Sequence, residues 1–156
     1  MDSIHVTPTT ASKINDVDFK NLGFGTEFSD HMLVCDYIDG TWGTPEIIAY
    51  QPISLMPSAK IFHYGQSIFE GMKAYKDTDH QTWLFRPEEN FKRFNISAKR
   101  LAIPELPKEV FMEGLKALLK VDEQWIPTQD GSSLYIRPII FATGEGFHAS
   151  PADAYK

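Results

Sequence analysis

Apolar and polar positions alternate in short runs over the first half of the chain, which is the pattern of half-buried β-strands. Residues 31–38 and 46–51 form one pair of such runs, and the Asp-Gly-Thr-Trp-Gly sequence between them supplies turn residues. Residues 72–75 and 82–85 form a second pair around a polar turn. We therefore predict two antiparallel hairpins.

Apolar positions recur at helical spacing in the middle of the chain. Pro87 suits the first position of a helix, and two glutamates follow it at the positive end of the helix dipole. The apolar residues that come next are spaced by three and four: Phe91, Phe94, Ala98 and Leu101. A second helix is predicted from Pro107 to about Val121, with apolar and charged stripes on opposite sides.

The remaining elements are less regular. Residues 64–69 are compatible with a helical turn that Gly71 ends, and residues 133–141 are predicted to form one long strand. Tyr135 and Arg137 then share a face of this strand, because side chains alternate between the two faces. Hairpins, helices and a closing strand follow one another in runs. This order predicts an α+β fold, in which the hairpins and the long strand form a sheet with two packed helices.

The composition is that of one globular domain with a core: 156 residues, 42% hydrophobic and 23% charged. The net charge is -6 and no run of Lys and Arg exceeds two residues, so we expect no nucleic-acid or anionic membrane partner. The sequence contains nothing like the ~18 consecutive apolar residues of a membrane span, and its start lacks the features of a signal peptide. We predict a cytoplasmic protein that acts on small molecules.

Common catalytic and metal-binding patterns do not occur in the sequence. The serines lie in no Gly-x-Ser-x-Gly motif, and the five histidines lack metal-ligand spacing, so we predict no metal site. Residues 144–149 match a loose dinucleotide pattern, but a Ser-Pro pair follows where that motif needs a helix. Asp30 and His31 are expected to be structural. Cys35 lies in an apolar run and is expected to be an unreactive packing residue.

Two arginines are candidate binding residues. Arg93 is predicted near the start of a helix and off its apolar stripe, where a guanidinium group can bind a phosphate through two hydrogen bonds. The position of Arg93 relative to the apolar stripe, taken by itself, favours an arginine that is simply exposed to solvent. Arg137 shares a strand face with Tyr135, and a charge on an otherwise apolar strand indicates that this face meets either a polar ligand or solvent. The residues themselves leave these alternatives open.

Several sequence blocks occur in a recognisable order. The most distinctive runs from His63 to Lys76 and contains Phe-Glu-Gly-Met-Lys-Ala-Tyr at 69–75. Further blocks are Leu-Phe-Arg-Pro at 84–87 and Tyr-Ile-Arg-Pro at 135–138. With these blocks the chain, from about residue 24 to residue 151, resembles the branched-chain amino acid aminotransferases, enzymes that use pyridoxal 5′-phosphate (PLP). The resemblance implies the small domain of the D-amino acid aminotransferase-like PLP fold.

The resemblance also implies roles for individual residues. Arg93 matches the arginine that anchors the PLP phosphate, and Arg137 matches the arginine that helps to bind the distal carboxylate of glutamate or 2-oxoglutarate. In family homodimers, the residues that match Tyr64, Phe147 and Ala149 reach the site of the neighbouring subunit. The residues implied to bind substrate are Phe24, Tyr64, Phe69, Tyr135, Arg137, Phe147 and Ala149.

Residues 1–21 are rich in Ser, Thr, Asp and Asn and show little periodicity, so we expect a mobile or loosely docked lead-in. The resemblance implies that residues 22–151 are an aminotransferase small domain and that residues 152–156 start the link to a missing large domain. The family's Schiff-base lysine and the glutamate that pairs with the pyridine nitrogen lie in that large domain. No catalytic residue is therefore assigned here, Lys73 included, and we expect a truncated chain that is inactive on its own.

The implied parent enzyme is a homodimer that transfers the amino group of leucine, isoleucine or valine to 2-oxoglutarate, which gives branched 2-oxo acids and glutamate. Two related alternatives are a D-amino acid transaminase and an aminodeoxychorismate lyase, although the blocks at 69–74 and 135–138 favour the branched-chain type. A third alternative is a non-catalytic ligand-binding or dimerisation module.

Overall fold

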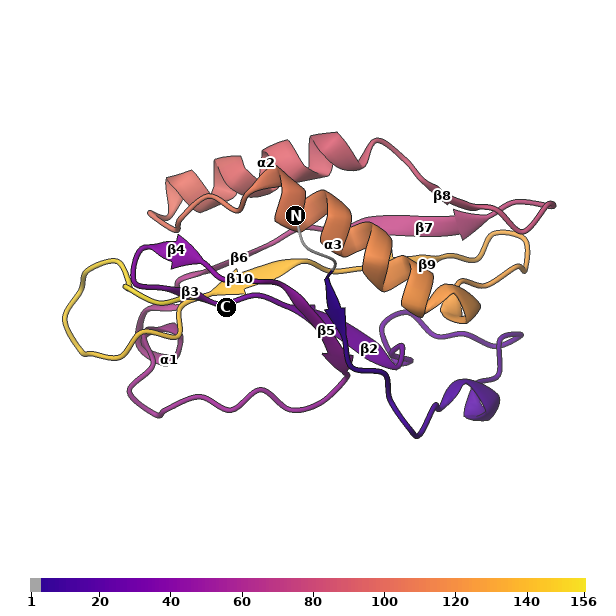
Figure 1. Ribbon diagram of the computed structural model, residues 1–156, viewed down its shortest axis with the longest axis horizontal. Coiled ribbons are helices and arrows are strands. Elements are labelled where there is room, and N and C mark those ends of the chain that lie inside the picture. The colour runs from indigo at the N-terminus through magenta and orange to yellow at the C-terminus, as the bar shows by residue number, and fades with distance from the viewer. Residues whose placement is uncertain (1–3) are drawn as a thin grey trace.

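Short β-strands and two long α-helices follow one another through residues 4–156, the part of the chain that the computed structural model describes. This mixture confirms the predicted α+β class (Figure 1). In chain order the elements are β1 (His5–Val6), the 3-10 helix η1 (Ile14–Asp16), β2 (His31–Val34), β3 (Tyr37–Ile38), β4 (Thr41–Trp42), β5 (Glu46–Ala49), α1 (Lys60–Tyr64), β6 (Ser67–Phe69), β7 (Met72–Lys76), β8 (Thr82–Leu84), α2 (Pro87–Arg100), α3 (Lys108–Val121), the 3-10 helix η2 (Glu123–Trp125), β9 (Leu134–Ile136) and β10 (Ile139–Phe141).

The pairing of the first predicted hairpin is confirmed, but the single strand predicted over residues 31–38 is divided into β2 and β3, which lie in different sheets. Strands β2 and β5 pair antiparallel, with His31 opposite Ala49, and β1 joins β5 as a parallel strand. A smaller hairpin, β3–β4, lies between them in the chain and turns at Asp39 and Gly40. Both turn residues have positive φ angles, 52° and 82°. Because Asp-Gly is a preferred pair for a tight turn of this kind, the sequence itself specifies the turn.

The second predicted hairpin is also confirmed, and a third strand extends it. Strand β7 pairs with β8 on one edge and with β9 on the other, where Lys73 lies opposite Tyr135. The single long strand predicted over residues 133–141 is wrong, because β9 and β10 are separate and β10 pairs with β6. Pro138 lies at the break. Proline has no N–H to donate to a sheet ladder, so the strand is interrupted there.

Helix α1 lies earlier in the chain than predicted. It spans Lys60–Tyr64 and ends at Gly65, whose φ angle of 62° is left-handed. The helical turn predicted for residues 64–69 is wrong, since Ser67–Phe69 form β6. A glycine with a left-handed conformation is a common end of a helix. Gly65, and not Gly71, therefore ends this one.

Helices α2 and α3 confirm the two predicted helices and lie along one side of the strands (Figure 1). Helix α2 begins at Pro87, as its sequence indicates. Phe94 of α2 packs against Phe111 of α3, with ring centroids 5.9 Å apart. Helix α3 packs on β2, where a Cβ on Gly114 would lie 2.5 Å from Leu33 Cδ2. The glycine therefore allows the close approach of helix and strand.

Replacing Phe94 with alanine is expected to lower the free energy of unfolding by about 3–5 kcal/mol, because the 1% exposed side chain would leave a cavity. The matched control is Ile96→Ala in the same helix. Ile96 is 69% exposed, so this change should alter the free energy by less than about 0.5 kcal/mol. Urea-induced unfolding followed by circular dichroism measures both. Equal losses would contradict the orientation of α2.

Hydrogen bonds join the N-terminal segment, residues 4–21, to the rest of the domain. The Thr9 N–H donates to His31 Nε2 at 2.9 Å, and the Lys13 N–H donates to Asp30 Oδ1 at 3.0 Å. On its other side, His31 Nδ1 lies 2.6 Å from Asp122 Oδ1. Asp30 and His31 therefore have the structural role expected of them, as attachment points for this segment.

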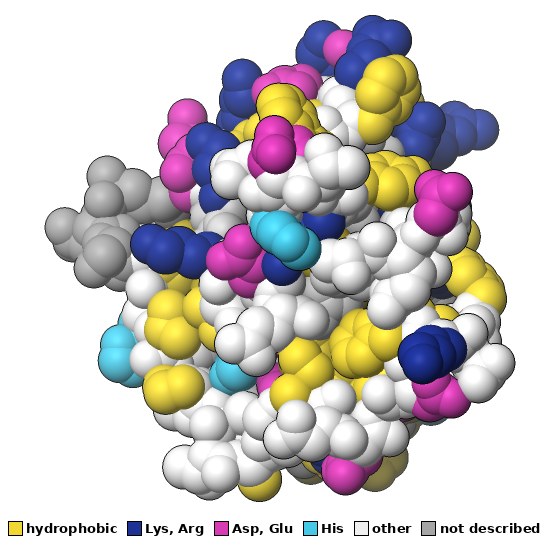
Figure 2. All heavy atoms as spheres, turned by 90° about the vertical axis from the view of Figure 1, so that its right-hand side faces the viewer, with side chains coloured by type: hydrophobic (Ala, Val, Ile, Leu, Met, Phe, Trp, Pro, Cys, Tyr) yellow, Lys and Arg dark blue, Asp and Glu magenta, His cyan; other side chains and the backbone are white. Residues whose placement is uncertain are grey.

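The surface carries several exposed aromatic side chains. Phe69, Trp83 and Phe85 are each more than half exposed. On the face shown in Figure 2, hydrophobic side chains reach the surface in several places among charged ones. Exposed apolar surface is typical of regions that contact another surface. No helix within residues 4–156 combines the length and the apolar character needed to cross a membrane.

Candidate functional site

Arg93 and Glu70 form an ion pair with two hydrogen bonds. Arg93, on α2, donates from Nε to Glu70 Oε2 and from Nη2 to Glu70 Oε1, both at 2.6 Å. The Glu70 side chain is 9% exposed, whereas that of Arg93 is 65% exposed. Glu70 Oε1 also accepts the Gly71 N–H at 2.8 Å, which fixes the carboxylate. The guanidinium group is therefore held in one orientation at the surface.

The ion pair leaves part of the guanidinium group available. Arginine has five N–H donors in a planar fork. Glu70 takes two of those on Arg93, and the side chain makes no other hydrogen bond within residues 4–156. Because the side chain is mostly exposed, the remaining donors are accessible to an anion. A planar fork of donors suits a phosphate group, which is the ligand that the resemblance implies for Arg93.

Hydrogen bonding from Arg93 holds the pKa of Glu70 below its ordinary value, although burial acts in the opposite direction. A carboxylate with a lowered pKa stabilises the fold above its unfolded-state pKa, and this stabilisation is lost as the pH falls through its folded-state pKa. Glu70→Gln should therefore lower the free energy of unfolding by about 1–3 kcal/mol at pH 7. The loss should be clearly smaller at pH 3. Urea-induced unfolding at the two pH values measures it.

The control for this pH dependence is Glu88→Gln. Glu88 is an exposed acid in the first turn of α2, and no ion pair within residues 4–156 includes it. The change should have a much smaller effect than Glu70→Gln at both pH values. A loss from Glu70→Gln that is the same at pH 7 and pH 3 would contradict a charged Glu70 in the folded protein.

Four of the predicted substrate-binding residues lie together beside this ion pair. Arg137 Nη2 donates to the Tyr135 hydroxyl at 2.8 Å, which confirms that the two side chains share a face. The guanidinium carbon of Arg137 lies 4.5 Å from the centre of the Phe69 ring and 5.2 Å from that of Tyr135. The Phe24 ring meets Tyr135 edge-on, with centroids 5.4 Å apart. These four residues are called the Arg137 group below.

Gly71 connects the ion pair to the Arg137 group. A Cβ on residue 71 would overlap the Tyr135 hydroxyl, so only glycine lets the phenol lie in its place. Asn90 Nδ2 donates to the Gly71 carbonyl at 3.2 Å and fixes the backbone from α2. Gly71 therefore contacts the phenol and, through its N–H, the carboxylate of the Arg93–Glu70 pair.

Glu70, Gly71 and Asn90 are not singled out by the sequence pattern. Glu70 lies between β6 and β7, and a buried acid needs a cationic partner, which is the signal that points to Arg93. Asn90 precedes Arg93 by three residues and so lies on the same side of the helix. For Gly71, only the packed structure shows that a side chain would collide with Tyr135.

A second group contains Tyr64, Phe147 and Ala149. The Tyr64 hydroxyl donates to the Phe147 carbonyl, and the His63 ring packs edge-on against the Phe147 ring with centroids 4.9 Å apart. The side chain of Phe147 is 69% exposed. Ala149 is also exposed and lies two residues further along the same segment. Residues 144–151 are called the Phe147 loop below.

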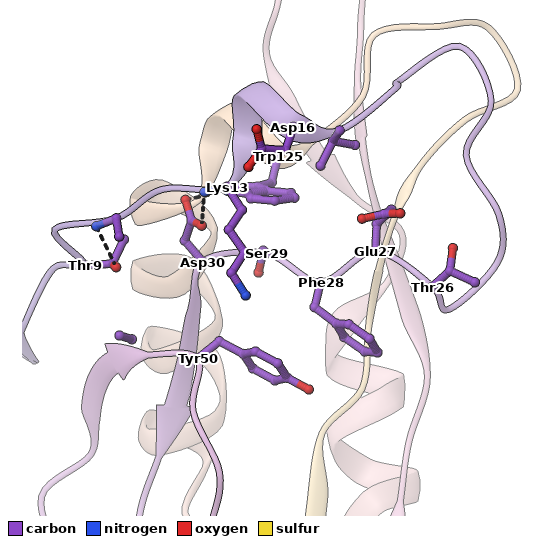
Figure 3. Close-up of a pocket in the computed structure, with 13 residues that line it drawn as sticks. Thr9, Lys13, Asp16, Thr26, Glu27, Phe28, Ser29, Asp30, Tyr50 and Trp125 are labelled. Carbon is purple, nitrogen blue, oxygen red and sulfur yellow. Dashed lines mark hydrogen bonds between the residues drawn. The ribbon is translucent and has the colours of Figure 1, made fainter.

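The two groups are separate open surfaces. Within residues 4–156, no hydrogen bond or ring contact joins the Arg137 group to Tyr64, Phe147 or Ala149. A hollow of about 280 Å³ lies elsewhere, between the N-terminal segment and residues 26–30 (Figure 3). Phe28 and Tyr50 form part of its wall, with stacked rings 5.3 Å apart. None of the predicted site residues lines this hollow.

Within residues 4–156, no group of three or more His, Cys, Asp or Glu side chains is arranged to hold a metal ion. Burial raises the pKa of the Cys35 thiol to about 11. The Cys35 Sγ donates to the Gly43 carbonyl at 3.3 Å. A thiol that is protonated at neutral pH is a poor nucleophile, so Cys35 is an unreactive side chain.

Comparison with known proteins gives close relatives. No protein-family model matches the chain. Branched-chain-amino-acid aminotransferase 2 of Bacillus subtilis is 47% identical over 148 residues, which are 94% of this chain and 41% of the relative. The branched-chain-amino-acid aminotransferase of Mycolicibacterium smegmatis is 46% identical over 156 residues, which are 99% of this chain and 42% of the relative. A probable branched-chain-amino-acid aminotransferase of Staphylococcus epidermidis is 50% identical over 140 residues, 89% of this chain and 39% of the relative.

The fold agrees with these relatives. The crystal structure of an Escherichia coli branched-chain amino acid aminotransferase matches with a TM-score of 0.58 and 23% identity, over 78% of this chain and 38% of that chain. At this identity the match shows the fold alone. The chain is therefore similar in sequence, over nearly its whole length, to branched-chain-amino-acid aminotransferases, and it spans about 40% of the length of these relatives.

Proposed function

We propose that this chain supplies the phosphate-binding and substrate-binding part of a PLP-dependent branched-chain amino acid aminotransferase. The observation that carries the proposal is the 46% to 50% identity to relatives with this name, over 89% to 99% of the chain. The oriented Arg93 and the Arg137 group support it, because they offer an anion site next to an aromatic surface.

The residues present fit the phosphate end of PLP. Arg93 binds the phosphate through the donors that Glu70 leaves available, and Glu70 keeps the guanidinium group in the required orientation. When bound, PLP supplies the electron sink that amino transfer needs. From the resemblance we infer that the lysine that carries PLP lies in the part of the relatives that this chain does not span.

The Arg137 group suits both kinds of substrate. The Phe24, Phe69 and Tyr135 rings present an apolar wall to the side chain of leucine, isoleucine or valine. Arg137, at the edge of this wall, pairs with the distal carboxylate of glutamate or 2-oxoglutarate. Tyr64 and the Phe147 loop lie apart from this wall, an arrangement that suits a homodimer in which they complete the site of the second copy.

The test uses an assembled enzyme, which is this chain joined to the part of the Bacillus subtilis relative that it does not span. Loaded with PLP, it should form glutamate from 2-oxoglutarate with L-leucine, L-isoleucine and L-valine. The three rates should agree within about tenfold, because a hydrophobic pocket discriminates weakly between such side chains. A preference for D-alanine as donor would favour a D-amino acid transaminase. A folded, PLP-loaded enzyme that accepts none of these donors would contradict the proposal.

A further inference from the structure

Lys60, the first residue of α1, is a buried lysine with no acidic partner. It is 5% exposed, and none of the ion pairs within residues 4–156 includes it. Its Nζ instead donates to Ser150 Oγ at 2.8 Å, to the Ser150 carbonyl at 3.1 Å and to the Pro151 carbonyl at 3.2 Å. A buried ammonium group needs hydrogen bonds to offset its lost hydration. All three partners belong to the Phe147 loop.

Lys60 attaches both ends of this loop. Its backbone N–H donates to the Gly144 carbonyl at 2.9 Å at the start of the loop, and its Nζ binds residues 150–151 at the end. Between the two ends, a Cβ on Gly146 would lie 3.6 Å from Lys60 Cε, so the lysine side chain runs beside the loop. Tyr64 donates to the carbonyl of Phe147 at the tip. The start, the tip and the end of the loop are therefore all attached to one short helix.

Stability alone gives no reason for a lysine at this position. Methionine has a similar length and would fill the same space without removing a charge from water. What the lysine adds is a set of directed hydrogen bonds to one segment. Those bonds fix the path of the loop, and thereby the place of the exposed Phe147 and Ala149.

We propose that Lys60 is a positioning residue, which holds the Phe147 loop in the conformation that presents Phe147 and Ala149 to the substrate. That Phe147 and Ala149 meet a substrate, and that this substrate is an aliphatic amino acid, rests on the proposed function. The anchoring of the loop does not, because it follows from the contacts of Lys60 alone. The two parts of the inference therefore need separate measurements.

Hydrogen exchange in the full 156-residue chain tests the anchoring. Lys60→Met should speed the exchange of amides in the Phe147 loop by about tenfold or more, and leave α2 and α3 unchanged. The matched control is Lys73→Met, which replaces an exposed lysine on β7 and should leave the loop unchanged. Ser150→Ala removes one of the three acceptors and should have a smaller effect in the same direction. If Lys60→Met does not fold, the exchange rates of the loop amides in Ser150→Ala show whether the loop is anchored. Unchanged loop exchange in the folded variants would overturn the proposal.

Kinetics of the assembled enzyme test the positioning. Lys60→Met should raise KM for leucine by about tenfold, with kcat within about twofold and the affinity for PLP unchanged. A smaller fraction of folded enzyme would not produce this split. Faster loop exchange with an unchanged KM, in an active enzyme, would overturn the positioning role. A third outcome is that Lys60→Met speeds loop exchange but even the unsubstituted enzyme transfers no amino group from leucine. This outcome would contradict the proposed function and leave the anchoring in place.

Discussion

The assembled enzyme with Arg93→Met is expected to bind PLP about 100-fold more weakly than the unsubstituted enzyme. A forked, charge-assisted contact to a phosphate is among the strongest hydrogen-bonded contacts in proteins, and methionine removes all of its donors. Glu70→Gln should weaken binding in the same direction but less, because the guanidinium group remains and only its orientation is lost. Absorbance titration with PLP and with pyridoxal, which lacks the phosphate, measures both effects.

The comparison between the two ligands makes this prediction specific. Arg93→Met should reduce the affinity for PLP and leave that for pyridoxal nearly unchanged. Lys92→Met is the control, since Lys92 is an exposed neighbour on α2 that pairs with Glu89. Equal losses for PLP and pyridoxal, or an equal loss of PLP binding in the Lys92 variant, would contradict the phosphate role of Arg93.

Arg137→Met is expected to raise KM for 2-oxoglutarate by about 100-fold while changing KM for leucine by less than about threefold. A carboxylate that loses its cationic partner in a desolvated pocket loses on the order of 2–5 kcal/mol of binding free energy. Leucine has no distal carboxylate, so its binding depends on the apolar wall instead. Steady-state kinetics of the assembled enzyme, with each substrate varied in turn, measure the two constants.

Two further variants separate the charge of Arg137 from its placement. Tyr135→Phe removes the hydroxyl that accepts from Arg137 Nη2 and should raise KM for 2-oxoglutarate by a smaller factor. Lys73→Met removes an exposed lysine opposite Tyr135 in the sheet and should change neither constant appreciably. If Arg137→Met affected leucine and 2-oxoglutarate equally, the distal-carboxylate role would be wrong.

The helices and hairpins are predictable from the sequence because their signals are local. The apolar stripe of α2 and the Pro87 start are complete within fourteen residues, and the Asp39-Gly40 pair specifies its own turn. The break after β9 has a local signal too, since Pro138 cannot donate to a ladder. The apolar residues on both sides of Pro138 nevertheless favour one continuous strand, and only the pairing partners of β9 and β10 reveal two.

The site is less predictable because its contacts join distant positions. Glu70 and Arg93 are 23 residues apart, and Lys60 and Ser150 are 90 apart. In the sequence, nothing distinguishes Lys60 from the other lysines, and its burial depends on how the Phe147 loop folds back over α1. The alternation of Tyr135 and Arg137 is the exception. In an extended chain, residues two positions apart point to the same face, so the contact between Tyr135 and Arg137 follows from their spacing in the sequence.

The transfer of nitrogen from [15N]leucine to 2-oxoglutarate tests the central claim most directly. The assembled enzyme, loaded with PLP, should convert the label into [15N]glutamate, and the part of the Bacillus subtilis relative without this chain should not. Mass spectrometry of the two amino acids measures the transfer. A folded, PLP-loaded enzyme that leaves the label in leucine would contradict the claim that this chain supplies the substrate-binding part. Equal transfer by the part without this chain would contradict it as well.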